Sequence, residues 1–151
     1  MNLTITNEVD MKRLGQAIGR VLVGGECIEL VGDVGAGKTT LTKGIAAGLG
    51  ISETVQSPTF TINRTYNSTG GVRLSHYDFY RLSDPGIMAD ELRESLDDPL
   101  TAIVIEWGDV VGTILPTDTL RITFSSPEEM TRVLNFSASG NTSTRILRSI
   151  G

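Results

Sequence analysis

The sequence predicts an α/β fold in which a mixed central sheet is flanked by helices and carries antiparallel hairpins. Three features predict it. Apolar residues at helical spacing over 8–22 precede a short apolar run at 27–31. A glycine-rich turn connects that run to a second helical pattern over 38–49, which Gly50 closes. Two pairs of strand-like runs follow later in the chain and indicate hairpins.

The helix expected over 8–22 follows Thr6 and Asn7, either of which could cap its first turn. Gly24 and Gly25 lie beyond its end and break the pattern. Its apolar side chains follow helical spacing: Val9, Met11, Leu14, Ile18 and Val21.

The hairpins are predicted from paired runs of strand-forming residues. The runs 59–66 and 72–79 flank a polar, glycine-containing turn over 67–71. The runs 119–125 and 131–137 form a second pair near the end of the chain. Antiparallel pairing within each pair is therefore expected.

A third helix is expected between the hairpins. Asp84 followed by Pro85 is typical of a helix start, and the pattern continues to Leu96. The segment is strongly acidic, and it is interpreted as a solvated helix face or as an acidic docking surface: Asp90, Glu91, Glu94, Asp97 and Asp98. The run 101–105 then predicts a short apolar strand.

Composition limits the function classes. The 151 residues suit one domain, predicted over 1–137, with a polar tail over 138–151 that is either loosely ordered or docked as a short helix. A net charge of −5 argues against autonomous nucleic-acid binding. The single cysteine, Cys27, excludes an internal disulfide and a cysteine-based zinc site. Without an apolar run of about 18 residues or a visible secretory signal, a cytoplasmic protein with no membrane association is expected.

The turn after the first apolar run fits the complete P-loop pattern G-x-x-x-x-G-K-T, from Gly32 to Thr39. Glycines let successive backbone N–H groups turn around phosphates, and the next helix presents its positive end to them. Lys38 can reach the β- and γ-phosphates, and the Thr39 hydroxyl can ligate Mg²⁺. The motif predicts a P-loop NTPase fold and these nucleotide-binding residues: Asp33, Val34, Gly35, Ala36, Gly37, Lys38, Thr39 and Thr40.

Two carboxylates are candidates for the metal side of such a site. Glu106 ends the apolar run 101–105 and could hold Mg²⁺ through water or polarise the attacking water. Asp78 could be the second carboxylate, so Lys38, Glu106 and Asp78 are the predicted catalytic residues. On a strand, His76 would share the face of Asp78, and a packed or hydrogen-bonded role is favoured for it over a catalytic base.

Four further features bear on the nucleotide site, and the first two leave alternatives open. Trp107 is either an apolar anchor or a residue beside the nucleotide or a partner. The segment 57–61 is either a γ-phosphate-sensing loop or a plain turn into a strand. Arg81 is the nearest candidate for an arginine finger. The run 109–112 matches the short Asp-x-x-Gly pattern of GTPases, but no Asn-Lys-x-Asp motif follows, so adenine is favoured over guanine.

Four motifs occur together in one order: GDVGAGKTT at 32–40, SPTFT at 57–61, HYDFYR at 76–81 and IEW at 105–107. In this combination the chain resembles the bacterial TsaE (YjeE) family, small ATPases of tRNA threonylcarbamoyladenosine biosynthesis. The resemblance extends from the first helix to about Glu129. It implies a P-loop fold and an Mg²⁺-dependent ATPase that supports turnover of a complex of the TsaD and TsaB proteins. That complex modifies the adenosine at position 37 of tRNA, so the chain would reach tRNA only through its partners.

The resemblance also implies roles for individual residues. Thr39 and Glu106 would serve the metal, and Asp78 would lie near the γ-phosphate or a partner surface. Three residues would lie at the nucleotide besides the P-loop itself: Asn7, Trp107 and Arg132. Asp109 departs from the family, which often has a glutamate two residues after its tryptophan.

Two rival functions remain open on the sequence. A small P-loop kinase would transfer phosphate to a metabolite or nucleotide, and three arginines could line its acceptor pocket: Arg64, Arg73 and Arg81. A nucleotide-dependent binding module would use ATP to order the segment 57–61 for a partner, with hydrolysis incidental.

Overall fold

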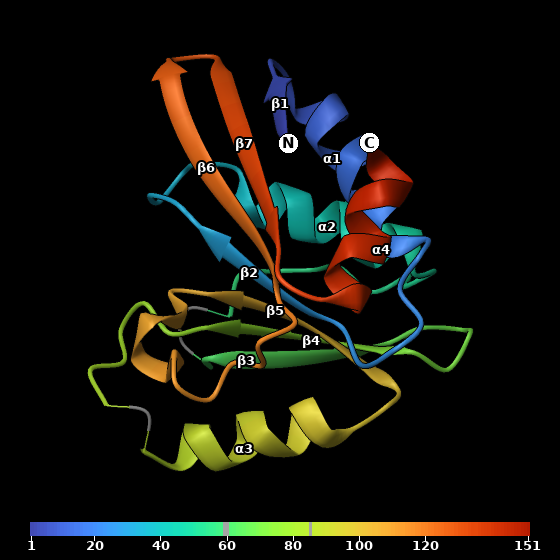
Figure 1. Cartoon of the computed structure of the whole chain (residues 1–151), viewed down its shortest axis with the longest axis vertical. Helices are drawn as coiled ribbons and strands as arrows, with labels where there is room; N and C mark the ends of the chain where they lie inside the picture. The colour runs from blue at the N-terminus through green and yellow to red at the C-terminus, as the bar shows by residue number, and fades with distance from the viewer. Residues whose placement is uncertain (59–60, 85) are drawn as a thin grey trace.

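The computed structural model describes residues 1–58, 61–84 and 86–151. Within them a seven-stranded sheet runs in the order β1-β7-β6-β2-β5-β4-β3 (Figure 1). The strands are β1 (Asn2–Ile5), β2 (Cys27–Val31), β3 (Asn63–Asn67), β4 (Arg73–Asp78), β5 (Thr101–Glu106), β6 (Leu120–Glu128) and β7 (Thr131–Ala138). β2, β4, β5 and β6 are parallel neighbours, whereas β1, β3 and β7 pair antiparallel with their neighbours. The prediction of an α/β fold with a mixed sheet and antiparallel hairpins is confirmed.

Helices cover both sides of this sheet. They are α1 (Glu8–Gly19), α2 (Lys38–Gly48), α3 (Gly86–Asp97) and α4 (Asn141–Ile150), with a short 3₁₀ helix, η1 (Gly108–Val111). Figure 1 shows α1, α2 and α4 on one side of the sheet and α3 on the other, where η1 packs with it around the smaller core cluster. None of the helices in the described ranges is both long and apolar enough to cross a membrane.

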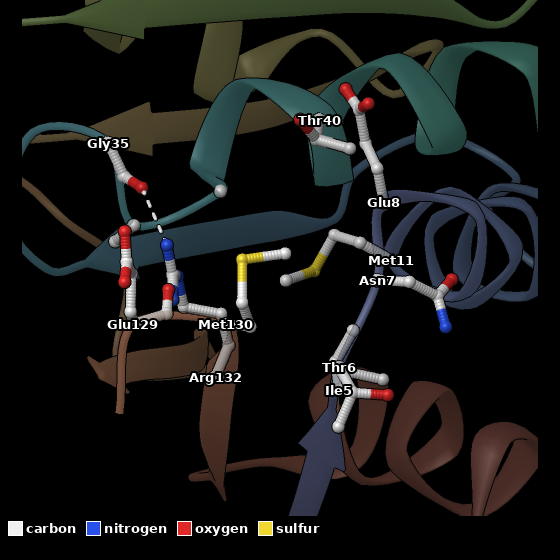
Figure 2. Close-up of a pocket in the computed structure, with 12 residues that line it drawn as sticks. Ile5, Thr6, Asn7, Glu8, Met11, Gly35, Thr40, Glu129, Met130 and Arg132 are labelled. Carbon is white, nitrogen blue, oxygen red and sulfur yellow. Dashed lines mark hydrogen bonds between the residues drawn. The ribbon is translucent and has the colours of Figure 1, made fainter. Parts of the chain in front are cut away.

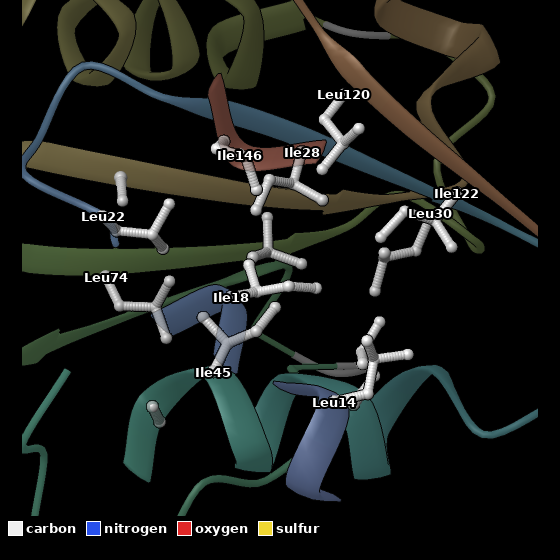
Figure 3. Packing of buried hydrophobic residues seen from close by; sticks show 14 of the residues in the cluster. Leu14, Ile18, Leu22, Ile28, Leu30, Ile45, Leu74, Leu120, Ile122 and Ile146 are labelled. Carbon is white, nitrogen blue, oxygen red and sulfur yellow. The ribbon is translucent and has the colours of Figure 1, made fainter. Parts of the chain in front are cut away.

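The apolar core is divided by the sheet into two clusters. The larger lies between the sheet and the helices α1, α2 and α4, and Figure 3 shows its central side chains meeting there: Leu14, Ile18, Leu22, Ile28, Leu30, Ile45, Leu74, Leu120, Ile122 and Ile146. The smaller packs beneath α3 around Tyr77, Phe79, Leu92, Ile103 and Ile105. Every residue of β5 is buried, which is expected of a central strand covered on both faces. Glu106 therefore ends its strand inside the protein.

The helices α1 and α2 pack with their backbones in close contact. A Cβ atom on Gly15 would lie 2.4 Å from the carbonyl oxygen of Leu41, and one on Gly44 would lie 2.4 Å from that of Lys12. Two further glycines, Gly19 and Gly48, make similarly close approaches one turn along. Because no side chain separates the two helices here, α1 fixes the position of α2 and of the turn that precedes it.

Several predicted boundaries differ from the observed ones for local reasons. The helix expected over 8–22 ends at Gly19, because Val21 and Leu22 donate to carbonyls only three residues back and tighten the last turn. The strand expected from residue 59 begins at Asn63, because Ile62 has φ 66° and donates its N–H to the carbonyl of Pro58. Thr59, Phe60 and Pro85, which belong to predicted elements, lie outside the described residues.

Two elements at the ends of the chain complete the fold. The strand β1 was not predicted, and it pairs with β7 at the edge of the sheet. Of the two alternatives for the segment 138–151, the docked helix is the one observed, as α4, with Ile146 in the larger core cluster. The second hairpin is longer than predicted, since β6 continues to Glu128.

Candidate functional site

The loop from Gly32 to Thr39 connects the central strand β2 to α2. Gly35 and Gly37 have φ values of 82° and 104°, which residues with a side chain rarely adopt. No side chain caps the N-terminus of α2, whereas Asn7 accepts a hydrogen bond from the backbone N–H of Asp10 at the start of α1. The first N–H groups of α2 are thus left for another acceptor, and such a helix end favours an anion.

The side chain of Lys38 is buried behind this loop. Its Nζ donates to the carbonyl oxygen of Gly32 at 2.6 Å and stands 3.7 Å from Oε1 of Glu106. The same nitrogen lies 4.5 Å from the centre of the Trp107 ring, a cation–π arrangement. The ammonium group is therefore held at the edge of the loop by one carbonyl, one carboxylate and one aromatic face.

The two predicted carboxylates come from neighbouring parallel strands. Asp78 and Glu106 are register partners at the ends of β4 and β5, and both are buried. They line a cavity of about 410 Å³ together with Thr39, Ser57 and other residues of the loop. Asp78 accepts a hydrogen bond from the backbone N–H of Tyr80 at 3.0 Å and one from the Ser57 hydroxyl at 3.4 Å. The sheet thus brings together the residues that the sequence predicted as catalytic.

His76 holds Glu106 from behind. The imidazole is fully buried, and its Nε2 lies 2.5 Å from Oε2 of Glu106. This agrees with the hydrogen-bonded alternative favoured for His76 from the sequence. Its surroundings leave no path for it to meet a ligand directly, because it lies behind the carboxylate.

Trp107 follows Glu106 in the left-handed region, with φ 57°. Its ring lies 4.8 Å from that of Tyr80, and both residues line the cavity with Arg81. Trp107 packs against the smaller core cluster and also lines this cavity, so its position fits both alternatives. Tyr80 was missed from the sequence, although its place two residues after Asp78 in HYDFYR was a usable signal.

A second cavity, of about 200 Å³, continues from the first around the loop. Gly35, Gly37 and Thr40 line both cavities. Figure 2 shows the remaining walls, which come from the start of α1 and the tip of the second hairpin: Ile5, Thr6, Asn7, Glu8, Met11, Glu129, Met130 and Arg132. The predicted residues Asn7 and Arg132, remote in sequence, therefore lie along one surface with the loop.

The second cavity has an apolar centre with a polar rim. The side chains of Met11 and Met130 extend toward each other across it (Figure 2). Arg132 is fixed by its Nη1, which donates to the carbonyl of Glu129 at 2.9 Å, and its Nη2 reaches that of Gly35 at 3.5 Å. The sequence placed Met11 on the apolar face of a helix, and this is confirmed, since Met11 belongs to the larger core cluster. The position of Met11 and Met130 at this cavity was missed.

Not every predicted residue lies at the cavities. Asp33 is exposed and is absent from both linings, although its carbonyl accepts from the N–H of Ala36 and shapes the loop. The thiol of Cys27 is not suited to catalysis, since burial raises its pKa to about 12 and keeps it protonated. Among the residues described, no cluster of three or more His, Cys, Asp or Glu side chains could hold a metal alone.

Metal binding here would thus need oxygens from a ligand or water. Thr39 and Glu106 can supply one oxygen each at the larger cavity. That donor set suits Mg²⁺, which prefers oxygen, keeps several waters and binds through one or two protein groups together with substrate phosphates. The uncapped N-terminus of α2 and the ammonium group of Lys38 are suited to binding the phosphate groups of such a substrate.

Comparisons with known proteins agree with this architecture. A family model described as threonylcarbamoyl adenosine biosynthesis protein TsaE matches residues 5–134. The tRNA threonylcarbamoyladenosine biosynthesis protein TsaE of Streptomyces coelicolor is 45% identical over 116 residues, which is 74% of this chain and 76% of that protein. The Bacillus subtilis protein of the same name is 36% identical over 138 residues, 89% of this chain and 84% of that one.

A solved structure is similar throughout. The crystal structure of Bacillus subtilis YdiB superimposes with a TM-score of 0.82 at 30% identity, covering 99% of this chain and 93% of that one. The region that the family model matches includes the loop, both carboxylates and Trp107. The chain therefore belongs to the TsaE family of tRNA threonylcarbamoyladenosine biosynthesis proteins.

Proposed function

We propose that the chain is an Mg²⁺-dependent ATPase that acts on a TsaD–TsaB partner complex and supports its turnover in tRNA modification. The observation that carries this proposal is the convergence on one cavity of Lys38, Glu106, Asp78 and the uncapped start of α2. A phosphate-binding lysine, carboxylates on the metal side and a helix N-terminus recur in enzymes that transfer a phosphoryl group to water.

The Gly32–Thr39 loop is the proposed phosphate-binding loop. The free N–H groups at the start of α2 would bind the phosphate oxygens, and Lys38 would exchange the carbonyl of Gly32 for them. This exchange is favourable because the cationic lysine gives up one neutral acceptor for an anionic one, which adds the attraction between opposite charges.

The metal side of the site is assigned to Thr39 and Glu106. When bound, Mg²⁺ neutralises charge on the phosphate oxygens. The Thr39 hydroxyl would ligate it directly, and Glu106 would hold one of its waters or orient the attacking water. Asp78, held by Tyr80 and Ser57, would face the same end of the phosphates.

The second cavity is the proposed place of the adenine and ribose. Met11 and Met130 provide an apolar, polarisable slot that suits a flat aromatic base. Asn7 and Arg132 provide polar groups at its rim. Because Gly35, Gly37 and Thr40 line both cavities, one molecule of ATP can occupy them together.

The partner requirement follows from charge and from family membership. The net charge of −5 disfavours direct binding of tRNA, so access through other proteins of the pathway is the simpler route. Turnover by the chain alone is expected to be slow and to rise when the TsaD and TsaB proteins are added.

The test is turnover of Mg·ATP by the purified chain, alone and with TsaD and TsaB from the same source. Lys38→Ala is expected to abolish the stimulated rate, and removal of a single charge-stabilising donor typically costs about 10²- to 10³-fold. Lys43→Ala is the matched control, because Lys43 lies on the exposed side of the same helix. Bound ATP without stimulation would refute the partner role, and phosphate transfer to an acceptor other than water would identify a kinase instead.

A further inference from the structure

We propose that His76 is a positioning residue that fixes the carboxylate of Glu106 in its working orientation. The inference rests on the proposed function, because it concerns the group assigned there to the metal and the attacking water. It extends that function to a residue with no access to the ligand, since the imidazole is fully buried behind Glu106.

The contact between the two side chains spans neighbouring strands. His76 lies on β4 opposite Val104, two residues before the Asp78–Glu106 pair, so the Glu106 side chain reaches back along the sheet to meet it. The Nε2–Oε2 distance of 2.5 Å is a close hydrogen-bond contact, and a carboxylate is the kind of charged acceptor that strengthens such a bond. The other oxygen, Oε1, stands 3.7 Å from Lys38 Nζ, beyond hydrogen-bonding range. One carboxylate oxygen is thus fixed by the imidazole and the other is left toward the cavity.

Orientation matters here because glutamate has three rotatable side-chain bonds. Ordering such a side chain costs conformational entropy. A hydrogen bond from a rigid, buried ring already orders the Glu106 side chain in the folded protein, so this entropy is not lost again each time a ligand binds. Without the bond, Glu106 would be free to pair more closely with Lys38, which would draw both groups away from the phosphate site.

The second nitrogen of the ring supports a dedicated role. Nδ1 of His76 is buried and has no hydrogen-bond partner among the described residues. A buried polar atom without a partner lowers the stability of the fold, and an apolar side chain at this core position would avoid that cost. A histidine at this position therefore lowers the stability of the fold, and what it supplies that an apolar residue could not is the hydrogen bond to Glu106.

Three substitutions separate positioning from packing. In His76→Gln the amide nitrogen can take the place of Nε2 and still donate to Glu106. His76→Asn places its amide near Nδ1, out of reach of Glu106, and His76→Met fills the space without a donor. Partner-stimulated kcat and KM for ATP are measured for each, with the melting temperature. The affinity for ADP is measured by calorimetry with and without Mg²⁺, as a readout independent of turnover.

Loss of a group that orients a metal-side residue typically costs about 10- to 100-fold in activity or metal affinity. His76→Met and His76→Asn are expected to lower kcat by that factor, with KM little changed, and to lose the gain in ADP affinity that Mg²⁺ gives. His76→Gln is expected to retain both. The inference is overturned if Met and Asn behave like the wild type, or if Gln loses as much as they do. If His76→Met does not fold, the Asn and Gln pair decides. A wild-type chain that never hydrolyses ATP would instead refute the proposed function.

Discussion

The ammonium nitrogen of Lys38 lies 4.5 Å from the centre of the Trp107 ring and donates at the same time to the carbonyl oxygen of Gly32. The indole is held in place by a left-handed backbone conformation, φ 57°, and by the ring of Tyr80. A bulky residue in that conformation is strained by about 1–3 kcal/mol, and such strain persists where the surroundings fix it. Any ligand that attracts the ammonium therefore changes the surroundings of the chain's single tryptophan.

Tryptophan fluorescence should consequently report nucleotide binding. Titration with Mg·ADP is expected to change the emission of Trp107 in a saturable way, because Lys38 leaves the ring for the phosphates. Lys38→Met should abolish the response at concentrations that saturate the wild type. Lys43→Met, on the exposed side of α2, should leave it intact. An equal response in Lys38→Met would contradict the assignment of this lysine.

The contact between α1 and α2 should not tolerate a methyl group. Gly15→Ala and Gly44→Ala gain up to about 1 kcal/mol in intrinsic helix propensity. Each new Cβ would nevertheless lie 2.4 Å from a backbone carbonyl oxygen of the other helix, so the helices must separate. Net destabilisation of about 1–3 kcal/mol is expected from urea unfolding. In the control Gly112→Ala, with φ −54°, the new Cβ would come no closer than 3.5 Å to a neighbouring atom, and stability should change little.

Asp98 should make stability depend on pH in the acid range. The pKa of its carboxyl is lowered from 3.8 to about 2, first by the backbone N–H of Leu100 and then by the hydroxyl of Thr101 and the guanidinium of Arg73. A lowered pKa means that the stabilisation is complete above the ordinary value and is lost as the pH falls toward 2. The difference in free energy of unfolding between the wild type and Asp98→Asn should be constant from pH 7 to 5.

That difference should then shrink between pH 4 and 2, as urea unfolding at several pH values would measure. Asp97→Asn, at the exposed neighbouring position, serves as the control. A difference that stays the same down to pH 2 would argue against the hydrogen bonds of Asp98 as its source.

The helix α4 is expected to depend on one buried carboxylate. Glu26 accepts hydrogen bonds from the N–H groups of Val23 and Gly24, both at 2.8 Å, and from Arg145 of α4 at 2.7 Å. Arg145→Ala leaves that carboxylate short of its cationic partner, which should cost about 1.5–3 kcal/mol in the free energy of unfolding. Arg148→Ala, exposed on the same helix, should stay within about 0.5 kcal/mol of the wild type. Equal effects of the two substitutions would rule out that the contact between Arg145 and Glu26 stabilises α4.

The sequence was most informative where the signal is local. The residues around Lys38 form a contiguous motif between a strand and a helix, so the loop and its lysine could be placed from the sequence alone. Glu106 was found because a carboxylate ends an apolar strand. The strand β1 was missed because four residues carry little pattern, and its structure comes from pairing with β7 at the far end of the chain.

Long-range contacts in the site were beyond prediction for the same reason. The hydrogen bond between His76 and Glu106 depends on β4 lying beside β5, which no local pattern specifies. Met11 and Met130 face one cavity only because α1 packs near the tip of the second hairpin. The sequence placed Met11 on the apolar face of a helix, which is confirmed, and no role was predicted for Met130.

The central proposal, that Lys38 and Glu106 bind and hydrolyse Mg·ATP, is tested by measuring binding and hydrolysis in the same samples. The wild type is compared with Lys38→Ala and with Glu106→Gln, which keeps the size of the side chain and removes its charge beside the metal position. The wild type should bind and hydrolyse ATP with the partner proteins present, Glu106→Gln should bind ATP without hydrolysing it, and Lys38→Ala should do neither. Hydrolysis by Glu106→Gln at the wild-type rate, or full-affinity binding by Lys38→Ala, would contradict the proposal.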